Sequence, residues 1–436
     1  MHSAVAWLVL FLLFVGLVGL TGCRFSLRPL LYDVRVEPAL ISPNADGVDD
    51  VTHIFYGLGR HANVSIYFVD AAGTRYYFRK EQPRSPGRYD VYWGGVIKGE
   101  TLYENEFTHA VVTDRVLPDG EYRWVIEATD DRGRTAQQSG VITLVDADTQ
   151  VPELRNFSVT PQLFRPNQDG LRDDRVAISY FLNKDVEEIQ VYLVDPKQPG
   201  VKYPIPERER EIEPGEAGYH YYDYEGGVDR GADPPPDGTY YVVGEARDAA
   251  GNRVMVTSTL TIVEGGKPRA DIVNADIDWQ GESDRSIFVP LGGTFCFTAT
   301  VENYGRVPIR TSGPWPGTVY NLDENYNTLA ARTGEDSWYI QAGVWRFGIN
   351  FETTGIDFPF RFAVGRKQDL ERRMIDGREQ WYLLPGHRGL VTGCIHANVP
   401  LPRQNVMFWG GLIHEQVGIN AENNYVDRVV VTVGVP

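Results

Sequence analysis

The sequence is short of positive charge. It has 42 Lys and Arg residues against 59 Asp and Glu, which gives a formal net charge of -17 over 436 residues. Proteins that bind nucleic acid draw affinity from Lys and Arg side chains that neutralise phosphates, so this balance argues against nucleic acid as a partner. The excess of carboxylates leaves two interpretations, which are a soluble surface and an attraction for divalent cations.

The sequence also lacks the motifs of common catalytic sites. It contains no Gly-x-Ser-x-Gly elbow, no phosphate-binding loop and no dinucleotide fingerprint. His414-Glu415 is not followed by a second His at the spacing of a zinc-protease helix, because Gly418 stands there. We therefore expect no enzyme activity and no catalytic residue.

Helical periodicity is a third absence. No stretch after the first 22 residues sustains the apolar spacing of an amphipathic helix. Aromatic residues make up 12% of the chain, with 45 Gly and 27 Pro, a composition typical of many short strands joined by turns. The sequence therefore predicts an all-β protein, and its length allows two to four domains.

A loop that occurs twice organises the chain. Ser42-Pro43-Asn44-Ala45-Asp46-Gly47 returns as Arg165-Pro166-Asn167-Gln168-Asp169-Gly170. Similar segments follow each copy in the same order: Val64 to Asp70 matches Ile189 to Asp195, Pro118 to Tyr122 matches Pro236 to Tyr240, and an Asp-x-x-Gly turn occurs at 130–133 and 248–251. Such self-similarity predicts two homologous domains, 34–147 and 152–264, with a third domain at 269–436.

The repeated motifs carry a resemblance. The Pro-Asn-x-Asp-Gly loops, the Pro-Asp-Gly-x-Tyr segments and their Asp-x-x-Gly turns resemble the immunoglobulin-like domain of the flagellar hook-capping protein and the C-terminal modules of gliding-motility and surface proteins. This resemblance covers 34–264 and implies Ig-like β-sandwiches that act as spacers, adhesive units or attachment domains. Hook capping itself is not implied.

The C-terminal third resembles a different module. Residues 294–303, with Pro385-Gly386 and residues 391–395, are similar to strands of cell-adhesion-related Ig-like domains. This likeness implies a third sandwich. The expected fold is thus three tandem Ig-like β-sandwich domains after an N-terminal lipoprotein signal peptide or membrane anchor.

The N-terminus has an apolar run from Ala4 to Gly22. The run ends in Leu20-Thr21-Gly22-Cys23, which resembles a bacterial lipobox, so the resemblance implies a signal peptide at 1–22, a lipid on Cys23 and a spacer at 23–33. An uncleaved membrane anchor is the alternative. Either arrangement predicts a protein held at the membrane of the cell envelope, on its extracytoplasmic side.

The repeated loops have oxygen-bearing side chains at alternate positions, as in an encircling calcium loop. The candidate ligands are Asn44, Asp46, Asp50, Asn167, Asp169 and Asp173. The alternative is an Asx-turn, in which these side chains accept hydrogen bonds from backbone amides two residues on. The sequence allows both a calcium loop and a turn, so calcium is the one cofactor that it suggests.

Two further features lie in the C-terminal domain. Cys296 and Cys394 are the pair available for a disulfide if Cys23 carries lipid, and buried free thiols are the alternative. The aromatic residues there, including Trp315, Trp338, Trp345, Trp381 and Trp409, suit either a hydrophobic core or the stacking of sugars.

Taken together, these patterns predict a non-catalytic, membrane-anchored surface protein that acts as a structural spacer, adhesion or binding module. Its expected partners are the membrane, other envelope proteins or glycans. The alternative function is a carbohydrate-binding or carbohydrate-active extracellular protein whose ligand site lies in the C-terminal domain. Facing carboxylates beside exposed tryptophans would favour the enzyme.

Overall fold

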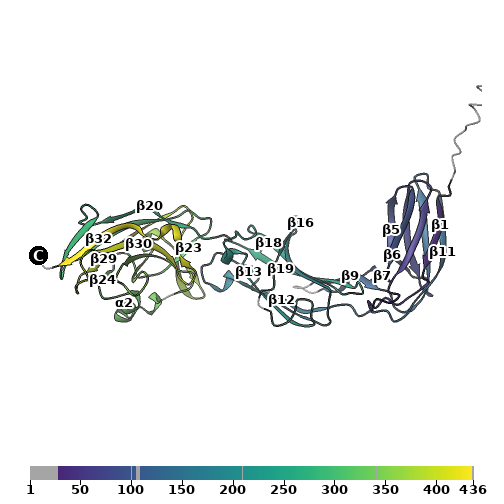
Figure 1. Cartoon of the computed structure of the whole chain (residues 1–436), viewed down its shortest axis with the longest axis horizontal. Coiled ribbons are helices and arrows are strands. Elements are labelled where there is room, and N and C mark those ends of the chain that lie inside the picture. Colours follow the sequence, from purple (N-terminus) through teal and green to yellow (C-terminus); the bar gives the residue numbers. More distant parts are fainter. Residues whose placement is uncertain (1–27, 100, 105–108, 209, 340, 435–436) are drawn as a thin grey trace, which may run out of the picture.

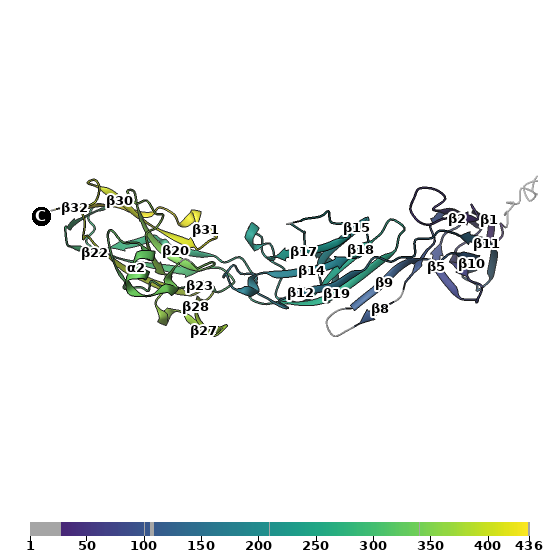
Figure 2. The same ribbon diagram turned by 90° about the horizontal axis from the view of Figure 1, so that it is seen from below.

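The computed structural model describes residues 28–99, 101–104, 109–208, 210–339 and 341–434. Strands make up most of their regular secondary structure, with one α-helix, α2 (Tyr326–Thr333), among them. They form three β-sandwich domains in a row, and the first stands at a steep angle to the other two (Figures 1 and 2). The all-β tandem fold predicted from the sequence is confirmed. Cys23 and the apolar run at 4–22 lie outside the described residues.

The first repeat packs a three-stranded sheet, ordered β1-β3-β6, on a five-stranded sheet, ordered β2-β11-β10-β4-β5. Its core is formed by residues such as Ile54, Phe68 and Trp93, whose side chains are almost fully buried. The strands are β1 (Leu31–Glu37), β2 (Leu40–Ile41), β3 (Thr52–Leu58), β4 (Ala62–Val69), β5 (Arg75–Arg84), β6 (Gly87–Trp93), β10 (Gly120–Asp130) and β11 (Thr135–Leu144).

The second repeat has the same architecture, with one sheet ordered β12-β14-β17 and a second containing β16-β15-β18-β19. Ile178 and Tyr180 lie in its core as Ile54 and Tyr56 lie in the first. The strands are β12 (Leu154–Thr160), β13 (Leu163–Phe164), β14 (Val176–Leu182), β15 (Glu188–Asp195), β16 (Gln198–Pro204), β17 (Gly218–Tyr224), β18 (Gly238–Arg247) and β19 (Arg253–Ile262).

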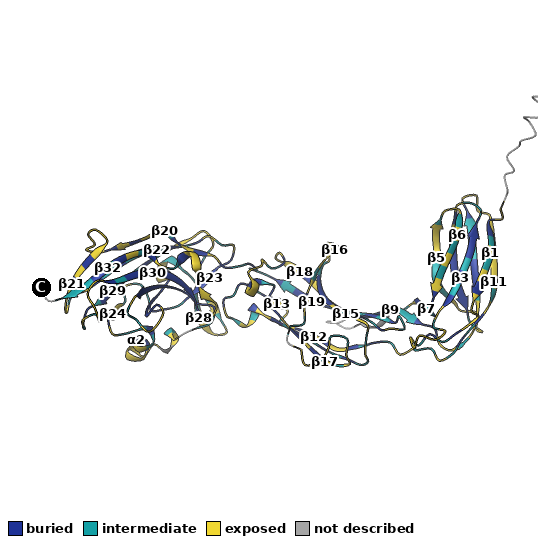
Figure 3. Ribbon diagram, in the orientation of Figure 1, coloured by how far each residue is buried: buried dark blue, intermediate teal, exposed yellow. Residues whose placement is uncertain are grey.

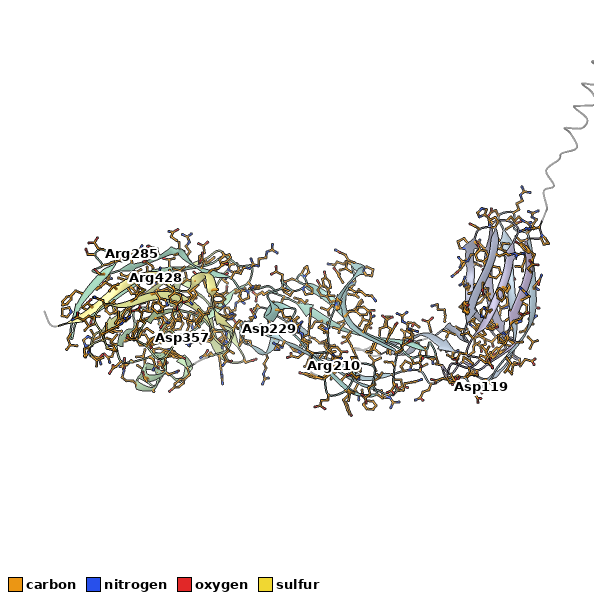
Figure 4. The ribbon with its side chains drawn as sticks, in the orientation of Figure 1. Asp119, Arg210, Asp229, Arg285, Asp357 and Arg428 are labelled. Atoms are coloured by element: carbon orange, nitrogen blue, oxygen red, sulfur yellow. A yellow bond between two sulfur atoms is a disulfide. The ribbon has the colours of Figure 1, made fainter. Side chains whose placement is uncertain are left out.

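The repeated sequence motifs make repeated hydrogen bonds. The Tyr122 hydroxyl donates to the Pro118 carbonyl at 2.9 Å, and Tyr240 donates to Pro236 at 2.7 Å. The side chain of Asp119 accepts from the amides of residues 146 and 147, as Asp237 does from those of 264 and 265. Each Pro-Asp-Gly-x-Tyr motif therefore fixes the start of a strand and the chain segment that leaves the domain. Figure 4 labels Asp119 at the end of the first repeat where the chain passes on.

A ribbon from the first repeat crosses to the second. It consists of β7 (Val96–Lys98), β8 (Thr101–Glu104) and β9 (His109–Val116), and β9 pairs antiparallel with β19 from Thr257↔His109 to Arg253↔Asp114. Ala110 belongs to the core of the second repeat. The ribbon thus extends the sheet of the second repeat by strand addition (Figure 2). Residues 96–116 fall within the predicted first repeat, 34–147, and no local motif in them indicates a pairing with the second repeat.

A polar network also connects the first and second repeats at this junction. The Lys184 ammonium donates to the carboxylates of Asp148 at 2.6 Å and Asp248 at 2.9 Å. The fully buried side chain of Asn252 accepts from the amide of Val116 and donates to the Asp148 carbonyl. The linker, the ribbon and the second repeat are therefore joined by strand pairing and by buried hydrogen bonds.

The C-terminal domain packs a sheet ordered β20-β22-β29-β24 on a larger one ordered β21-β32-β30-β25-β23-β28-β27. Figure 3 shows the buried residues of its facing strands. The elements are β20 (Ala270–Trp279), β21 (Ser286–Pro290), β22 (Thr294–Asn303), β23 (Ile309–Thr311), β24 (Val319–Asn321), α2, η3 (Asp336–Trp338), β25 (Trp345–Phe351), β26 (Phe360–Ala363), β27 (Glu371–Ile375), β28 (Arg378–Leu383), β29 (Arg388–His396), β30 (Val406–His414), β31 (Gly418–Ile419) and β32 (Val426–Gly434).

Cys296 and Cys394 form a disulfide with a Cα–Cα distance of 4.0 Å, so the predicted pairing is confirmed. The two residues stand directly opposite each other on β22 and β29. The bond therefore joins neighbouring strands of one sheet rather than the two sheets of the sandwich. It closes a loop with a sequence separation of 98 residues.

Candidate ligand-binding site

The loop of the first repeat is an exposed set of turns. The Asp50 carboxylate accepts from the amides of Ala45 at 2.8 Å and Gly47 at 2.7 Å. Asn44 accepts from the amide of Asp46, and Asp46 accepts from that of Val48, each two residues on. These bonds are those of the turn interpretation, because amide hydrogens rather than oxygens surround the Asp50 carboxylate.

The loop of the second repeat makes the same hydrogen bonds, but the carboxylate that accepts from its amides comes from a residue one position later in the loop. Asn167 accepts from the amide of Asp169, and Asp174 accepts from those of Asn167 at 3.2 Å and Gly170 at 2.5 Å. The counterpart of Asp50 is therefore Asp174 and not Asp173, whose carboxylate is paired with Arg165. The loop is one residue longer in the second repeat, so a fixed spacing from Asn167 selects Asp173 instead of Asp174.

Metal binding by the loops stays a prediction. Within the part of the chain that the structure describes, no group of three or more His, Cys, Asp or Glu side chains is placed to hold a metal ion.

The second loop is inserted into the C-terminal domain. The Tyr382 hydroxyl donates to Asp169 at 3.1 Å, and His414 Nε2 donates to the Gln168 carbonyl at 2.8 Å. Gly170 and Gly343 meet backbone to backbone, since a Cβ on Gly170 would lie 2.0 Å from the Ala342 carbonyl oxygen. Asp229, labelled in Figure 4, lies at the same end of the second repeat.

This docking changes the acid–base properties of the loop. Burial raises the pKa of Asp174 to about 7, and the nearby Asp169 carboxylate adds to the shift. Burial also raises the pKa of Asp169. On the opposite side of the junction, burial lowers the pKa of His414 to about 4. The junction therefore favours neutral forms of both kinds of group.

Glu415, next to His414, holds a buried ion cluster. Its carboxylate accepts from Arg346 at 2.8 Å and from Arg361 at 2.6 Å, and all three side chains are buried. Arg361 also lies 4.0 Å from the centre of the Tyr326 ring. His414 and Glu415 thus have structural roles, in keeping with the incomplete zinc motif.

A cleft of about 1400 Å³ opens beside the docked loop. Its lining comes from the segment after β23, from the 335–342 loop, from the β27–β28 hairpin and from the loop of the second repeat. The lining residues used below are Arg172, Arg310, Trp315, Glu335, Trp338, Lys367, Asp376, Arg378, Glu379, Gln380 and Trp381. We call this site the tryptophan cleft. It is larger than the ~300–1,000 Å³ of typical small-molecule pockets, so it has room for an extended ligand.

Three of the tryptophans singled out from the sequence meet in the cleft. The rings of Trp315 and Trp381 are 5.8 Å apart and edge to face, and all three indoles are half-buried. Trp338 lies against Gly313, where a Cβ would come within 2.2 Å of its Nε1. Trp345 and Trp409, by contrast, are buried at 5% and 6% exposure. Trp345 and Trp409 therefore belong to the hydrophobic core, whereas Trp315, Trp338 and Trp381 are placed where sugars could stack on them.

Polar groups flank the indoles. The Lys367 ammonium lies 5.0 Å from the ring centre of Trp315 and 5.4 Å from that of Trp381. The Arg310 side chain is 5% exposed and donates to the Gln380 side-chain oxygen at 3.1 Å and to the Ala342 carbonyl. Neither cation was singled out from the sequence, because no motif surrounds them and the fold alone brings them to the tryptophans.

Comparisons with known proteins give little beyond the fold. No protein-family model and no curated protein matches the chain. Solved structures that align with it include a tetra-tandem repeat in the extending region of a large adhesion protein (12% identity, 92% of this chain and 72% of that chain, TM-score 0.18). A second is a 1.5-MDa bacterial ice-binding adhesin (11% identity, 93% of this chain and 96% of that chain, TM-score 0.18). A third is the Bacteroides ovatus mixed-linkage glucan utilization locus protein SGBP-B in complex with a mixed-linkage heptasaccharide (12% identity, 91% of this chain and 65% of that chain, TM-score 0.15). At these TM-scores the likeness carries no argument about function, and the hook-capping resemblance rests on the motifs alone.

Proposed function

We propose that the chain is a non-catalytic surface protein in which two Ig-like repeats form a stalk and the C-terminal domain binds a glycan. The observation that carries this proposal is the tryptophan cleft. Sugar rings present apolar faces that pack on indoles, and the hydroxyl groups around them pair with amide and charged side chains. Trp338, Trp381 and Gln380 supply both kinds of contact in one cavity.

The stalk role is supported by the two junctions. Strand β9 pairs with the next domain, and the second loop is inserted into the domain after it. Both devices join consecutive domains by backbone contacts and buried polar bonds. Such a chain would hold the cleft away from the end at which the described residues begin, as the extended row in Figure 1 illustrates.

The absence of catalysis is part of the proposal. Glycoside hydrolysis uses a pair of carboxyl groups, one of which is kept protonated by an apolar environment. The cleft carboxylates Glu335, Asp376 and Glu379 are all exposed, and Glu379 is paired with Arg372 at 3.0 Å. This arrangement supports binding rather than turnover.

Attachment to the membrane is the remaining part, and it rests on the lipobox-like Cys23. The described residues contain no helix long and apolar enough to cross a membrane. Metabolic labelling with a palmitate analogue tests the lipid: the wild type should be labelled and Cys23→Ala should not. Labelling of both chains, or of neither, would reject a lipid on Cys23.

The binding function is tested with the full chain, solubilised in mild detergent, on a panel of oligosaccharides. We expect at least one glycan class to bind the wild type, with Trp381→Ala reducing the affinity at least about tenfold, since truncation of a tryptophan that anchors an interface costs about 2 kcal/mol or more. Trp409→Phe, a buried change outside the cleft, is the control. Binding that is unchanged in Trp381→Ala and Trp338→Ala would remove the cleft from the account.

A further inference from the structure

The cationic side chains of the tryptophan cleft are unusual in so acidic a chain. Arg172, Arg310, Lys367 and Arg378 all line it, although the formal net charge of the protein is -17. Among the described side chains, none of these four cations forms an ion pair with a carboxylate. Most other cations of the C-terminal domain do, as in the pairs of Arg366 with Asp369 and Arg388 with Glu302.

Arg310 is the most constrained of the four. It is buried, its two terminal nitrogens donate to neutral oxygens, and its Nε has no hydrogen-bond partner. Its charge interacts with the carboxyl groups of Asp169 and Asp174, but burial raises the pKa of both and so favours their neutral forms. The positive charge of Arg310 is therefore incompletely compensated. An anion that enters the cleft would compensate that charge.

Lys367 is held at the aromatic surface itself. Its ammonium lies between the rings of Trp315 and Trp381, each within 5.4 Å. Lys367 is exposed, so its ammonium can also bind a carboxylate or sulfate of a ligand that packs on the same indoles. Arg378 starts β28 three residues before Trp381, and its exposed guanidinium has the planar fork that binds such groups bidentately.

The carboxylates that line the cleft do not neutralise the positive charge of these four side chains. Glu379 is paired with Arg372, which does not line the cleft. Glu335 and Asp376 are exposed, and water screens their charge. Among these cleft residues the buried charge is that of Arg310, and Lys367, although exposed, lies beside the two indoles.

We propose that the ligand of the tryptophan cleft is an anionic glycan, whose sugar rings pack on the indoles while its acidic groups meet Lys367, Arg378 and Arg310. This inference rests on the proposed glycan-binding function and adds the charge of the ligand to it. Carboxylates of uronic acids and sulfate esters share the chemistry that these cations recognise.

The test compares matched probes on the full chain by titration calorimetry. One probe is an oligogalacturonate, the second is the same oligomer after its carboxyl groups are reduced to neutral alcohols, and the third is a sulfated oligosaccharide of equal length. We expect an acidic probe to bind at least about tenfold more tightly than the neutral one, because a charge-assisted hydrogen bond contributes enough for such a ratio. Raising the salt concentration should narrow the difference.

Two variants test which cations cause the preference for the acidic probe. Lys367→Gln with Arg378→Gln should remove most of the preference for the acidic probe, whereas Arg428→Gln should keep it. Arg428 is an exposed cation on β32 of the same domain and lies outside the cleft (Figure 4). Because the comparison of probes uses the unaltered protein, it holds even if a variant fails to fold.

The outcomes separate the two proposals. Equal affinity for the acidic and reduced oligomers would overturn the anionic ligand and leave glycan binding in place. Preference for the sulfated over the carboxylated probe would support the inference and identify the acidic group. A poly-glutamate peptide that binds as tightly as the glycans would overturn the ligand class, and failure of all the glycans to bind would overturn both proposals.

Discussion

Asp50 and Asp174 make equivalent hydrogen bonds in the two repeats, yet only Asp174 is enclosed by another domain. Asp50 accepts from the amide of Gly47 at 2.7 Å, and Asp174 accepts from that of Gly170 at 2.5 Å. The first loop is exposed to water, whereas Asp174 is 8% exposed beneath the C-terminal domain. The same loop sequence is therefore an exposed turn in one repeat and a junction between domains in the other.

This enclosure predicts a pH dependence of the junction. The pKa of Asp174 is raised to about 7 in the folded protein, so the native state keeps a proton that the unfolded chain loses above the ordinary value of 3.8. Stability should then fall as the pH rises through that window, and Asp174→Asn should reduce the fall, while Asp169, whose pKa burial also raises, keeps part of it. The lowered pKa of His414, about 4, has the opposite effect and favours a rise in stability between pH 4 and about 6.5, so the variant should lose less stability over this range than the wild type.

Thermal melts of the full chain at pH 4 to 8 measure both effects. Asp50→Asn is the matched control, because it changes the same hydrogen bonds in the exposed loop. A pH profile that is identical in the wild type and in Asp174→Asn would show that Asp174 does not titrate in this range.

The ribbon predicts that the angle between the first two domains is fixed. Ala110 is fully buried in the core of the second repeat, so Ala110→Asp places a charge where it has no partner and should detach β9 from β19. Small-angle scattering should then show a broader range of overall dimensions than in the wild type. Lys98→Ala, an exposed change in the same ribbon, should not. Identical scattering from the wild type and both variants would contradict a fixed angle between the first two domains.

The disulfide should stabilise the C-terminal domain. In the chain-entropy model, a crosslink that closes a loop of this length contributes ~4.7 kcal/mol. Cys296→Ser should lower the free energy of unfolding by about that amount, and reduction of the wild type should reproduce the loss. Denaturant titration followed by tryptophan fluorescence measures it, since six of the nine Trp lie between Trp279 and Trp409. A reduced protein that is as stable as the oxidised one would contradict the prediction.

Calcium binding by the exposed loop can be tested by thermal melting. The observed bonds use Asn44, Asp46 and Asp50 to accept backbone amides, so we expect millimolar calcium to leave the melting temperature unchanged. Bound calcium would instead raise the stability by about 2.7 kcal/mol at a hundredfold excess over its dissociation constant. Melts of the full chain with calcium and with chelator, for the wild type and Asp46→Ala, separate these cases. A calcium-dependent rise that is lost in Asp46→Ala would establish the site.

The sequence was sufficient for the fold because its motifs are local. The Tyr of the Pro-Asp-Gly-x-Tyr motif donates to the Pro carbonyl four residues before it in both repeats, at Tyr122 and at Tyr240. It was insufficient where distant segments meet. Nothing near Val112 indicates that it pairs with Val254 of the next domain, and nothing near Lys367 indicates that it lies between Trp315 and Trp381. Cys296 and Cys394 were paired correctly because few alternatives existed.

The most direct test of the account is a crystal structure of the full chain with a bound oligosaccharide from the class that the binding panel selects. The account predicts a sugar ring packed against Trp338 or Trp381, with its polar groups bonded to Gln380 or Lys367. A glycan bound to the repeats, or to the C-terminal domain away from the tryptophan cleft, would contradict it.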